Sequence, residues 1–345
     1  MIILGIESSC DETAAALFET PDHILASVIA SQVATHSEFG GVVPELASRE
    51  HLDNICYVVE ACFEEASRKG RTLDWKDVQA VAVTRGPGLM GALLVGMAYA
   101  KALAYSLGIP FLGVNHLQGH IYSIFLDHSQ AELPALSLVV SGGHTSLFYM
   151  TQMTEYELIA RTRDDAAGEA LDKLAKLLGL GYPGGPIIDR LAPLGRSDAI
   201  RFSLPKISDQ SLDFSFSGLK TAALRHVQQK ELKPIRPGAE NPSSEILDLL
   251  ASYQKSIIDQ ILDRLEKALE GREVRSIHIS GGVSCNSELR RRSTEFFKGK
   301  GLPVYYPRPA LTTDNAVMIA AAATLRLQAG SQDPWSLPAD PNLAL

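Results

Sequence analysis

The chain has 345 residues, 46% of them hydrophobic and 21% charged, which excludes a mainly disordered protein and suggests two domains or two halves of one fold. Its four cysteines include no C-x-x-C pair, which excludes a disulfide scaffold, disfavours a cysteine zinc site and fits a reducing cytosol. The formal net charge of -8 disfavours nucleic-acid binding through global charge alone.

No segment is expected to span a membrane or to act as a signal peptide. The most apolar stretch, 88–100, is shorter than the ~18 to 20 residues that a spanning helix needs. The first residues lack a basic region and turn acidic at once. We therefore expect a cytoplasmic protein with no membrane partner.

Residues 1–114 predict an α/β lobe. An apolar run, 2–6, predicts a buried strand, and a polar loop, 7–13, separates it from a second strand, 14–18. A helix is expected near 61–69 and a strand at 78–83. A glycine- and proline-rich turn, 84–91, then enters a helix that ends near 107, and a strand follows at 110–114.

The second half opens in the same order, with a strand at 136–140, a loop at 141–145 and a strand at 146–150. We interpret this as a weak internal repeat. A strand at 275–279 leads to a further helix, and 312–315 begins an alanine-rich helix that ends near 327. We expect a second α/β lobe over 115–328, with a helical and loop insertion around 150–250, and an irregular tail over 329–345.

Three polar loops are candidate ligand-binding elements. Loops 7–13 and 141–145 could clamp a phosphate chain with backbone N–H groups and hydroxyls, although each taken singly is better explained as a hairpin turn. Ser280-Gly281-Gly282 could admit a base or ribose beside Asn286, or could form a tight turn. Neither G-x-G-x-x-G nor the P-loop pattern is present, which disfavours those nucleotide-binding classes.

His116 and His120 are four residues apart, so their imidazoles face one side of a helix and can share a metal ion. A metal needs a third ligand, and Asp314 is the candidate; its alternative role is a helix cap. Leu117 stands where zinc peptidases of the H-E-x-x-H type have their glutamate base, which argues against that class.

Asp172 and Asp189 are candidate acceptors for the hydroxyls of a sugar. The alternative, favoured for each taken alone, is a solvated helix face on which Asp172 pairs with Lys173 or Lys176.

Together these motifs resemble the bacterial tRNA threonylcarbamoyladenosine transferase family (TsaD), formerly described as O-sialoglycoprotein endopeptidases. The resemblance runs from residue 3 to about 325 and excludes the tail. It rests on segments 5–13, 40–51, 84–88, 101–121, 140–144, 168–173, 214–221, 280–286 and 313–316. It implies the actin- and sugar-kinase-like (ASKHA) fold, in which two duplicated α/β lobes enclose a nucleotide cleft.

The resemblance implies transfer of the threonylcarbamoyl group from threonylcarbamoyl-AMP to the N6 amine of the adenosine 3′ of the anticodon, in tRNAs that read codons starting with A. It implies one divalent metal ion, iron first and zinc as the alternative, held by His116, His120 and Asp314. ATP or ADP could occupy the same cleft as the adenylate. Asp11 and Glu12 are candidate proton acceptors. The implied substrate-binding residues are Val139, Val140, Ser141, Gly142, Gly143, Asp172, Gly185, Asp189 and Asn286.

The implied partners are tRNA, a paralogous subunit of the same fold that forms a heterodimer, a small ATPase, and an upstream enzyme that makes the adenylate. Cys56, Val59 and Phe63 form an apolar stripe that is either a docking face or, more simply, part of the core. Basic groups could contact tRNA or be solvated faces: Arg161, Arg163, Lys206, Lys220, Arg225, Lys230, Lys233, Arg236 and Arg290 to Arg292.

Three rival functions make different predictions. A metallopeptidase would cleave a protein substrate, a non-catalytic scaffold of the same fold would need no metal, and a small-molecule kinase would not need the histidine pair.

Overall fold

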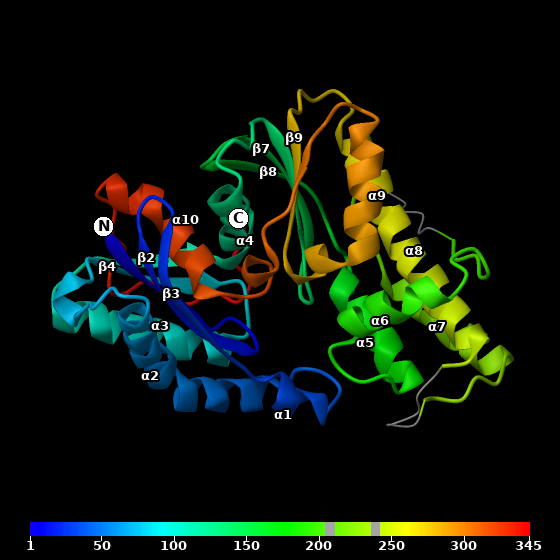
Figure 1. Cartoon of the computed structure of the whole chain (residues 1–345), viewed down its shortest axis with the longest axis horizontal. Coiled ribbons are helices and arrows are strands. Elements are labelled where there is room, and N and C mark those ends of the chain that lie inside the picture. Colours follow the sequence, from blue (N-terminus) through cyan, green and yellow to red (C-terminus); the bar gives the residue numbers. More distant parts are fainter. Residues whose placement is uncertain (204–210, 236–241) are drawn as a thin grey trace. The chain divides into compact units, whose positions relative to one another are not determined.

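Figure 1 shows the computed structural model, which describes residues 1–203, 211–235 and 242–345. The chain forms two compact units. Unit 1 comprises Met1–Ser129 and Pro307–Leu345, and unit 2 comprises Gln130–Tyr306. Each unit contains a five-stranded mixed sheet.

The sheet of unit 1 has the strand order β3-β2-β1-β4-β5. Its strands are β1 (Ile2–Glu7), β2 (Glu12–Glu19), β3 (His23–Ser31), β4 (Ala80–Gly86) and β5 (Phe111–Asn115). The first three strands are antiparallel neighbours, whereas β1, β4 and β5 run parallel. The carboxyl ends of these three parallel strands therefore meet at one edge of the sheet.

Helices cover both faces of this sheet, which explains why all six residues of β1 are buried. Ile2, Leu4 and Ile6 join a core that includes apolar residues of α2 (Pro44–Arg68) and α3 (Met90–Leu107). On the other face, a Cβ added at Gly5 would overlap the carbonyl oxygen of Ala316, at the start of α10 (Ala316–Gln328). Glycine thus lets α10 lie close to β1. The short helices α1 (Val33–Ser37) and η1 (Trp75–Asp77) lie in the connections.

Among the described residues, α3 is the one helix long and apolar enough to cross a membrane by length and composition. It is longer than the apolar stretch seen in the sequence. Its residues Leu93 and Met97 are buried, and α3 contacts β4 and α2. These contacts are those of a core helix in a folded unit.

The sheet of unit 2 has the order β10-β9-β6-β7-β8. Its strands are β6 (Ala135–Val140), β7 (Thr145–Gln152), β8 (Glu155–Arg161), β9 (Ser276–Ser280) and β10 (Val304–Tyr305). β6 pairs antiparallel with β7 and parallel with β9, as β1 pairs with β2 and β4. The two sheets therefore have the same strand connectivity, and the predicted internal repeat corresponds to β1 and β2 in unit 1 and to β6 and β7 in unit 2.

Five helices in the described part of unit 2 share one hydrophobic core with this second sheet. They are α5 (Ala167–Leu178), α6 (Gly184–Leu191), α7 (Ser217–Gln229), α8 (Ser244–Ala268) and α9 (Ser287–Lys298). The sequence predicted a helix after the strand at 275–279, where α9 lies, but not the length of α8.

The compact units differ from the expected lobes 1–114 and 115–328. α4 (His116–Asp127) and α10 belong to unit 1, because they pack on each other and α10 contacts β1 and β2. Segment 150–250, expected as an insertion, contains β8, which pairs with β7, and helices that supply core residues of unit 2.

The tail 329–345 forms no helix or strand, and hydrogen bonds attach it to unit 1. The Asp333 amide donates to the Phe111 carbonyl oxygen, and the Asp333 carboxylate accepts from the Gly113 amide. Near its end, the Leu343 and Ala344 carbonyl oxygens accept from the Asn115 side chain. The tail therefore covers β5, the edge strand of the sheet.

Candidate functional site

The candidate metal ligands converge in unit 1. α4 begins directly after β5, and its first residue, His116, lies one turn before His120. The Nε2 atom of His120 is 3.2 Å from Asp314 Oδ1, and the Nε2 atom of His116 is 3.5 Å from the same oxygen. Both imidazoles are buried, and the three candidate ligand atoms lie within 4.8 Å of one another. The structure thus brings together all three residues predicted as metal ligands.

These separations fit a divalent metal ion. Bonds of roughly 2.0 to 2.1 Å in tetrahedral geometry place ligand atoms about 3.3 Å apart. The two measured separations, 3.2 and 3.5 Å, bracket that value. Two imidazoles and one carboxylate are also the donor set of catalytic zinc and non-haem iron sites, which keep positions open for substrate.

Asp314 is not the helix cap that was its alternative role. The cap of α10 is Asn315, whose side chain accepts from the Met318 amide. The next residue in the chain, Asn315, therefore satisfies the helix start while Asp314 turns toward the histidines.

Polar groups lie around the Nδ1 atom of His116. Its Nδ1 lies 3.0 Å from Glu7 Oε2 and 3.2 Å from the Ser9 hydroxyl. The Thr84 hydroxyl donates to Glu7 Oε2 at 2.6 Å, and the Ser9 amide donates to Glu7 Oε1 at 2.5 Å. Glu7 is fully buried, so these donors replace the water that a carboxylate would otherwise require.

The buried charges shift each other's pKa values in opposite directions. Burial opposes a charge on His116, but the Asp314 and Glu7 carboxylates outweigh it and raise the pKa of His116 to about 9. Burial would likewise raise the pKa of Glu7, but the adjacent His116 cation holds it below its usual range. Burial lowers the pKa of His120, so one imidazole of the pair is neutral and ready to ligate.

Asp11 and Glu12, the candidate proton acceptors, lie where loop 7–13 enters β2. Burial raises the pKa of Glu12 well above its usual range, and the negative charges of Asp314 and Asp11 add to this effect. Both acids therefore belong to the electrostatic environment of the candidate metal ligands in unit 1.

The predicted substrate loop in unit 2 connects β6 to β7. Val139 and Val140 end β6, and the Ser141 amide donates to the His144 carbonyl oxygen to close the turn. Gly142 and Gly143 are exposed, and a Cβ added at either would meet no atom within 4 Å. The loop is a hairpin turn, as its alternative reading held, and its tip is open to a ligand.

Two further glycines pack against this loop. A Cβ at Gly168 would lie 2.7 Å from the Ser141 carbonyl oxygen, and the Gly168 amide donates to that oxygen. Gly281, which has a φ of +89°, approaches the Val140 carbonyl oxygen from the end of β9. The motifs 140–144, 168–173 and 280–286 therefore meet at one edge of the second sheet.

The remaining substrate candidates lie on the helices beside that edge. Asp172 on α5 accepts from the Gly184 amide at 2.7 Å, which fixes the start of α6, where Gly185 also lies. Lys173 pairs with Asp165 and Glu169. Asp172 is thus used in the packing of α5 against α6.

Asp189 and Asn286 together hold the start of α9. Asp189 accepts from the Ser287 amide at 3.0 Å and from its hydroxyl at 2.9 Å. Asn286 caps the helix through the Leu289 amide and donates to Gln254 Oε1. α6, α8 and α9 are therefore linked by the two residues that were predicted to bind the adenylate.

Sequence reasoning did not assign Glu7 and Thr84, which surround His116. One signal was available: Glu7 ends a wholly apolar run, and a carboxylate at a buried strand end needs a specific partner. β1 and β4 run parallel, and Ile6 of β1 is paired with Val83 of β4. Thr84 therefore occupies the position on β4 that corresponds to Glu7 on β1.

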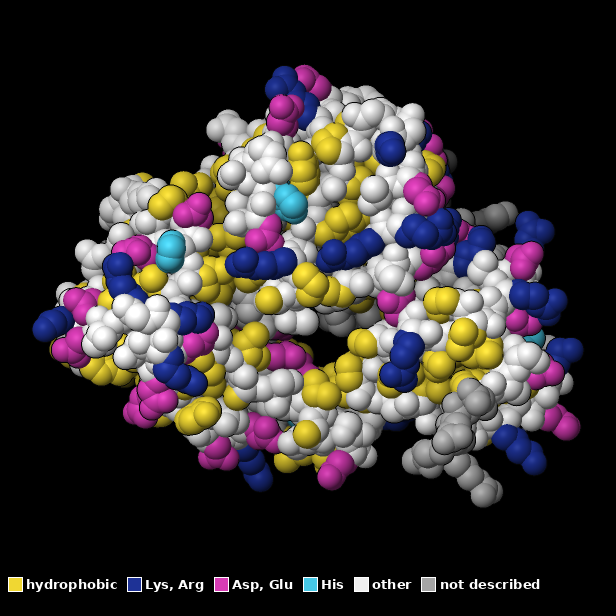
Figure 2. All heavy atoms as spheres, viewed as in Figure 1, with side chains coloured by type: hydrophobic (Ala, Val, Ile, Leu, Met, Phe, Trp, Pro, Cys, Tyr) yellow, Lys and Arg dark blue, Asp and Glu magenta, His cyan; other side chains and the backbone are white. Residues whose placement is uncertain are grey.

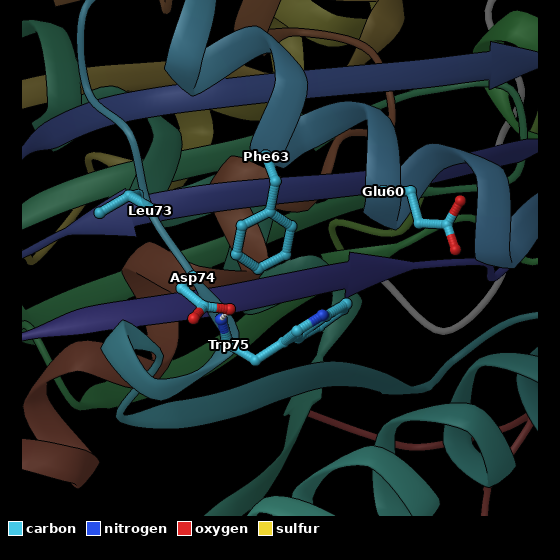
Figure 3. A pocket seen from close by; sticks show the side chains of 5 residues that line it. All are labelled: Glu60, Phe63, Leu73, Asp74 and Trp75. Atoms are coloured by element: carbon cyan, nitrogen blue, oxygen red, sulfur yellow. Dashed lines mark hydrogen bonds between the residues drawn. The ribbon is translucent and has the colours of Figure 1, made fainter.

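A separate pocket of about 340 Å³ lies in unit 1 between α2 and the residues around η1. Figure 3 shows the side chains that line it, Glu60, Phe63, Leu73, Asp74 and Trp75. The Phe63 and Trp75 ring centroids are 4.5 Å apart. This lining contains none of the predicted site residues.

Comparisons with known proteins identify the family. A family model described as TsaD, tRNA N6-adenosine threonylcarbamoyltransferase, matches residues 23–321. A protein of that name from Clostridium perfringens is 49% identical over 344 residues, which cover 100% of this chain and 98% of the relative. Another from Clostridium botulinum is 47% identical, with coverage of 99% and 97%.

Solved structures show the fold at low sequence identity. The (R)-2-hydroxyglutaryl-CoA dehydratase component A of Acidaminococcus fermentans is 12% identical, with a TM-score of 0.53 and coverage of 95% of this chain and 99% of that one. HypF from T. kodakarensis is 14% identical, with a TM-score of 0.60 and coverage of 95% and 48%. These likenesses support the expected ASKHA fold. The chain belongs to the tRNA N6-adenosine threonylcarbamoyltransferase family, and its activity is the transfer of a threonylcarbamoyl group to adenosine in tRNA.

Proposed function

We propose that His116, His120 and Asp314 hold one divalent metal ion, iron first and zinc as the alternative, while the threonylcarbamoyl group passes from threonylcarbamoyl-AMP to tRNA. The observation that carries this proposal is the convergence of two imidazole nitrogens on Asp314 Oδ1 at 3.2 and 3.5 Å, in a buried part of unit 1. When bound, such an ion supplies Lewis acidity toward the carbamoyl oxygen.

The transfer needs orientation more than covalent help from the protein. A bond forms between the adenosine N6 atom and the carbamoyl carbon, the bond from that carbon to the phosphate oxygen breaks, and AMP leaves. The amine loses one proton, for which Asp11 and Glu12 are the proposed acceptors. Orientation of the two reactants accounts for a large share of the rate in such reactions.

The adenylate is proposed to bind unit 2. The exposed tip at Gly142 and Gly143 would present backbone N–H groups to the phosphate, with Val139, Val140 and Ser141 forming the base of the loop. Asp172, Gly185, Asp189 and Asn286 are proposed to bind the nucleoside. The hydrogen bonds that these four residues make fix the helix ends beside the loop.

A transfer assay tests the metal proposal. The chain, its partner proteins and unmodified tRNA are incubated with radiolabelled threonylcarbamoyl-AMP, and label in tRNA is counted. We expect His116→Ala to lose at least a hundredfold in rate, whereas His23→Ala, an exposed histidine on β3, keeps the rate of the unmodified chain. The metal proposal would be overturned if His116→Ala transferred the label to tRNA at the rate of the unmodified chain and to the same final amount per tRNA.

The anticodon arm of tRNA is proposed to contact basic residues around α7. Lys220, Arg225, Lys230 and Lys233 are exposed, and none forms an ion pair within the described part of the chain. Figure 2 shows Lys and Arg side chains interspersed with Asp and Glu over the face it presents, so a local cluster must act without a broad basic field. Lys206 and Arg236 lie outside the described residues.

Other basic residues are occupied locally. Arg291 pairs with Glu288 and Glu295, Arg292 pairs with Asp259, and Arg163 pairs with Asp213. This supports the interpretation of run 290–292 as a structural feature of α9. Arg291 is therefore a suitable control for the residues around α7.

Salt dependence of tRNA binding separates the two groups. We expect Lys220→Ala/Arg225→Ala to weaken tRNA binding and to reduce the slope of log affinity against log salt by about 1 to 2, because each phosphate contact releases counterions. Arg291→Ala should leave the slope unchanged. An unchanged slope in the double variant would exclude this surface.

We propose that the paralogous subunit docks on an apolar face of unit 1. The predicted stripe divides, since Val59 is buried in the core whereas Cys56 is exposed. The exposed large apolar residues of the packed pair α2 and α3 are Leu52, Tyr57, Met90, Leu94 and Tyr105. Leu52→Asp/Leu94→Asp should abolish co-elution with that subunit in gel filtration, whereas Leu158→Asp in unit 2 should not.

The small ATPase, the adenylate-forming enzyme and the cytoplasmic location stay predictions from the family resemblance.

A further inference from the structure

Glu7 is a buried carboxylate that none of the assigned roles uses. It is the last residue of β1 and has no exposed surface. Its position follows from the sheet, because β1, β4 and β5 run parallel and their carboxyl ends carry Glu7, Thr84 and His116 respectively. A charged side chain in such a place is costly unless it is fully hydrogen-bonded.

Two of its three hydrogen bonds come from groups that are not candidate metal ligands. The Ser9 amide donates to Oε1 and the Thr84 hydroxyl donates to Oε2. The third donor is the ring of His116, whose Nδ1 lies 3.0 Å from Oε2. This third contact ties the carboxylate to the candidate metal ligand.

The contact determines which nitrogen of His116 can bind a metal ion. A carboxylate only accepts hydrogen bonds, so it favours the tautomer with the proton on Nδ1. The lone pair of the neutral ring then lies on Nε2, the atom that faces Asp314 at 3.5 Å. The Ser9 hydroxyl, 3.2 Å from Nδ1, is a weaker acceptor than the carboxylate.

We infer that Glu7 is a positioning residue for the metal site: its carboxylate fixes the tautomer and the ring orientation of His116 and increases the ligand strength of Nε2. Carboxylates in this role behind a metal-bound histidine contribute about 10- to 100-fold to metal affinity. The inference rests on the metal site of the proposed function.

Cobalt(II) is the probe for this inference, because its visible absorption reports the ligands directly. The full chain is titrated with cobalt(II) in competition with a chromophoric chelator. We expect Glu7→Gln to bind cobalt(II) about 10- to 100-fold more weakly than the unmodified chain and to shift its visible bands. Glu19→Gln, a surface carboxylate that pairs with Arg71 in the same unit, should change neither.

Two further variants keep the test decisive. Thr84→Val removes one donor from the Glu7 carboxylate without removing its charge, and we expect a few-fold loss of cobalt affinity. If Glu7→Gln does not fold, as judged by circular dichroism, an unchanged cobalt affinity in Thr84→Val overturns the inference. If Glu7→Gln folds and binds with unchanged affinity and spectrum, the inference is wrong.

Asp314→Asn distinguishes failure of this inference from failure of the metal proposal. Loss of cobalt binding in Asp314→Asn, with unchanged binding in Glu7→Gln, leaves the metal site intact and removes Glu7 from it. Equal binding by the unmodified chain and Asp314→Asn means that cobalt binds elsewhere, and both proposals fall.

Discussion

Gly281 offers the sharpest test of how unit 2 forms its ligand-binding edge. Its φ of +89° and ψ of 164° belong to a region that essentially only glycine adopts. A Cβ there would lie 2.5 Å from the carbonyl oxygen of Val140. The backbone of Gly281 follows Ser280, and the backbone of Val140 follows Val139. Because Val139 and Ser280 are paired, neither backbone can move without disturbing the β6–β9 pairing.

The cost of Gly281→Ala follows from these two effects. Backbone strain of this kind costs about 1 to 3 kcal/mol. Overpacking against a fixed neighbour costs about 1 to 3 kcal/mol more. We therefore expect the free energy of unfolding to fall by about 2 to 6 kcal/mol, and binding of threonylcarbamoyl-AMP to weaken because loop 140–144 shifts.

Gly282→Ala is the matched control. A Cβ at Gly282 meets nothing within 4 Å, so this substitution should change stability by less than about 1 kcal/mol. Urea unfolding of both variants, followed by far-UV circular dichroism, measures the difference, and isothermal titration gives the affinity for the adenylate. Equal midpoints for the two variants would refute the steric argument.

Three further predictions concern unit 1. Burial lowers the pKa of His51, so the unfolded chain takes up a proton more readily than the folded chain, and stability should fall as the pH drops below about 6.5. His51→Gln should flatten this pH dependence in urea unfolding measured between pH 7.5 and 5. Trp335, half-exposed in the tail, stacks on Phe111 with ring centroids 6.0 Å apart. Trp335→Ala should therefore lower the free energy of unfolding by about 2 to 3 kcal/mol, as followed by circular dichroism. An unchanged unfolding midpoint would mean that the tail adds no stability. Removal of bound metal by a chelator should lower the melting temperature, since a ligand at a hundred times its dissociation constant stabilises the folded state by about 2.7 kcal/mol. If the chelator lowers the melting temperature of His120→Ala by the same amount, the metal does not bind through His120.

Local sequence patterns were sufficient to predict most strands and the histidine pair. Alternation and apolar runs identified β1, β2, β4, β5, β6, β7 and β9, because buried strands must be apolar on the faces they present to helices. The spacing of His116 and His120 follows directly from the helical repeat. The sequence motifs also identified the family, which the comparisons confirm.

The bounds of the two units depended on packing that the sequence does not display. α10 returns to the first sheet although it follows the whole of unit 2 in the chain. The edge strands β3 and β8 were also missed, because they are partly exposed and lack a continuous apolar run. The sequence analysis did not predict the long helix α8 either.

The site shows the same division between sequence and tertiary structure. The sequence alone predicted a histidine pair on one helix face as metal ligands, two glycine loops and the family. The sequence also named Asp314 as a candidate third ligand but left open whether it caps a helix; only the tertiary structure gave that cap to Asn315, turned Asp314 toward the histidines and placed Glu7 behind His116. The reason is that a short-range pattern records which side chains share a helix face. Glu7 and His116 meet because parallel strands bring their carboxyl ends to one edge, and Asp314 meets the histidines because α10 packs on α4.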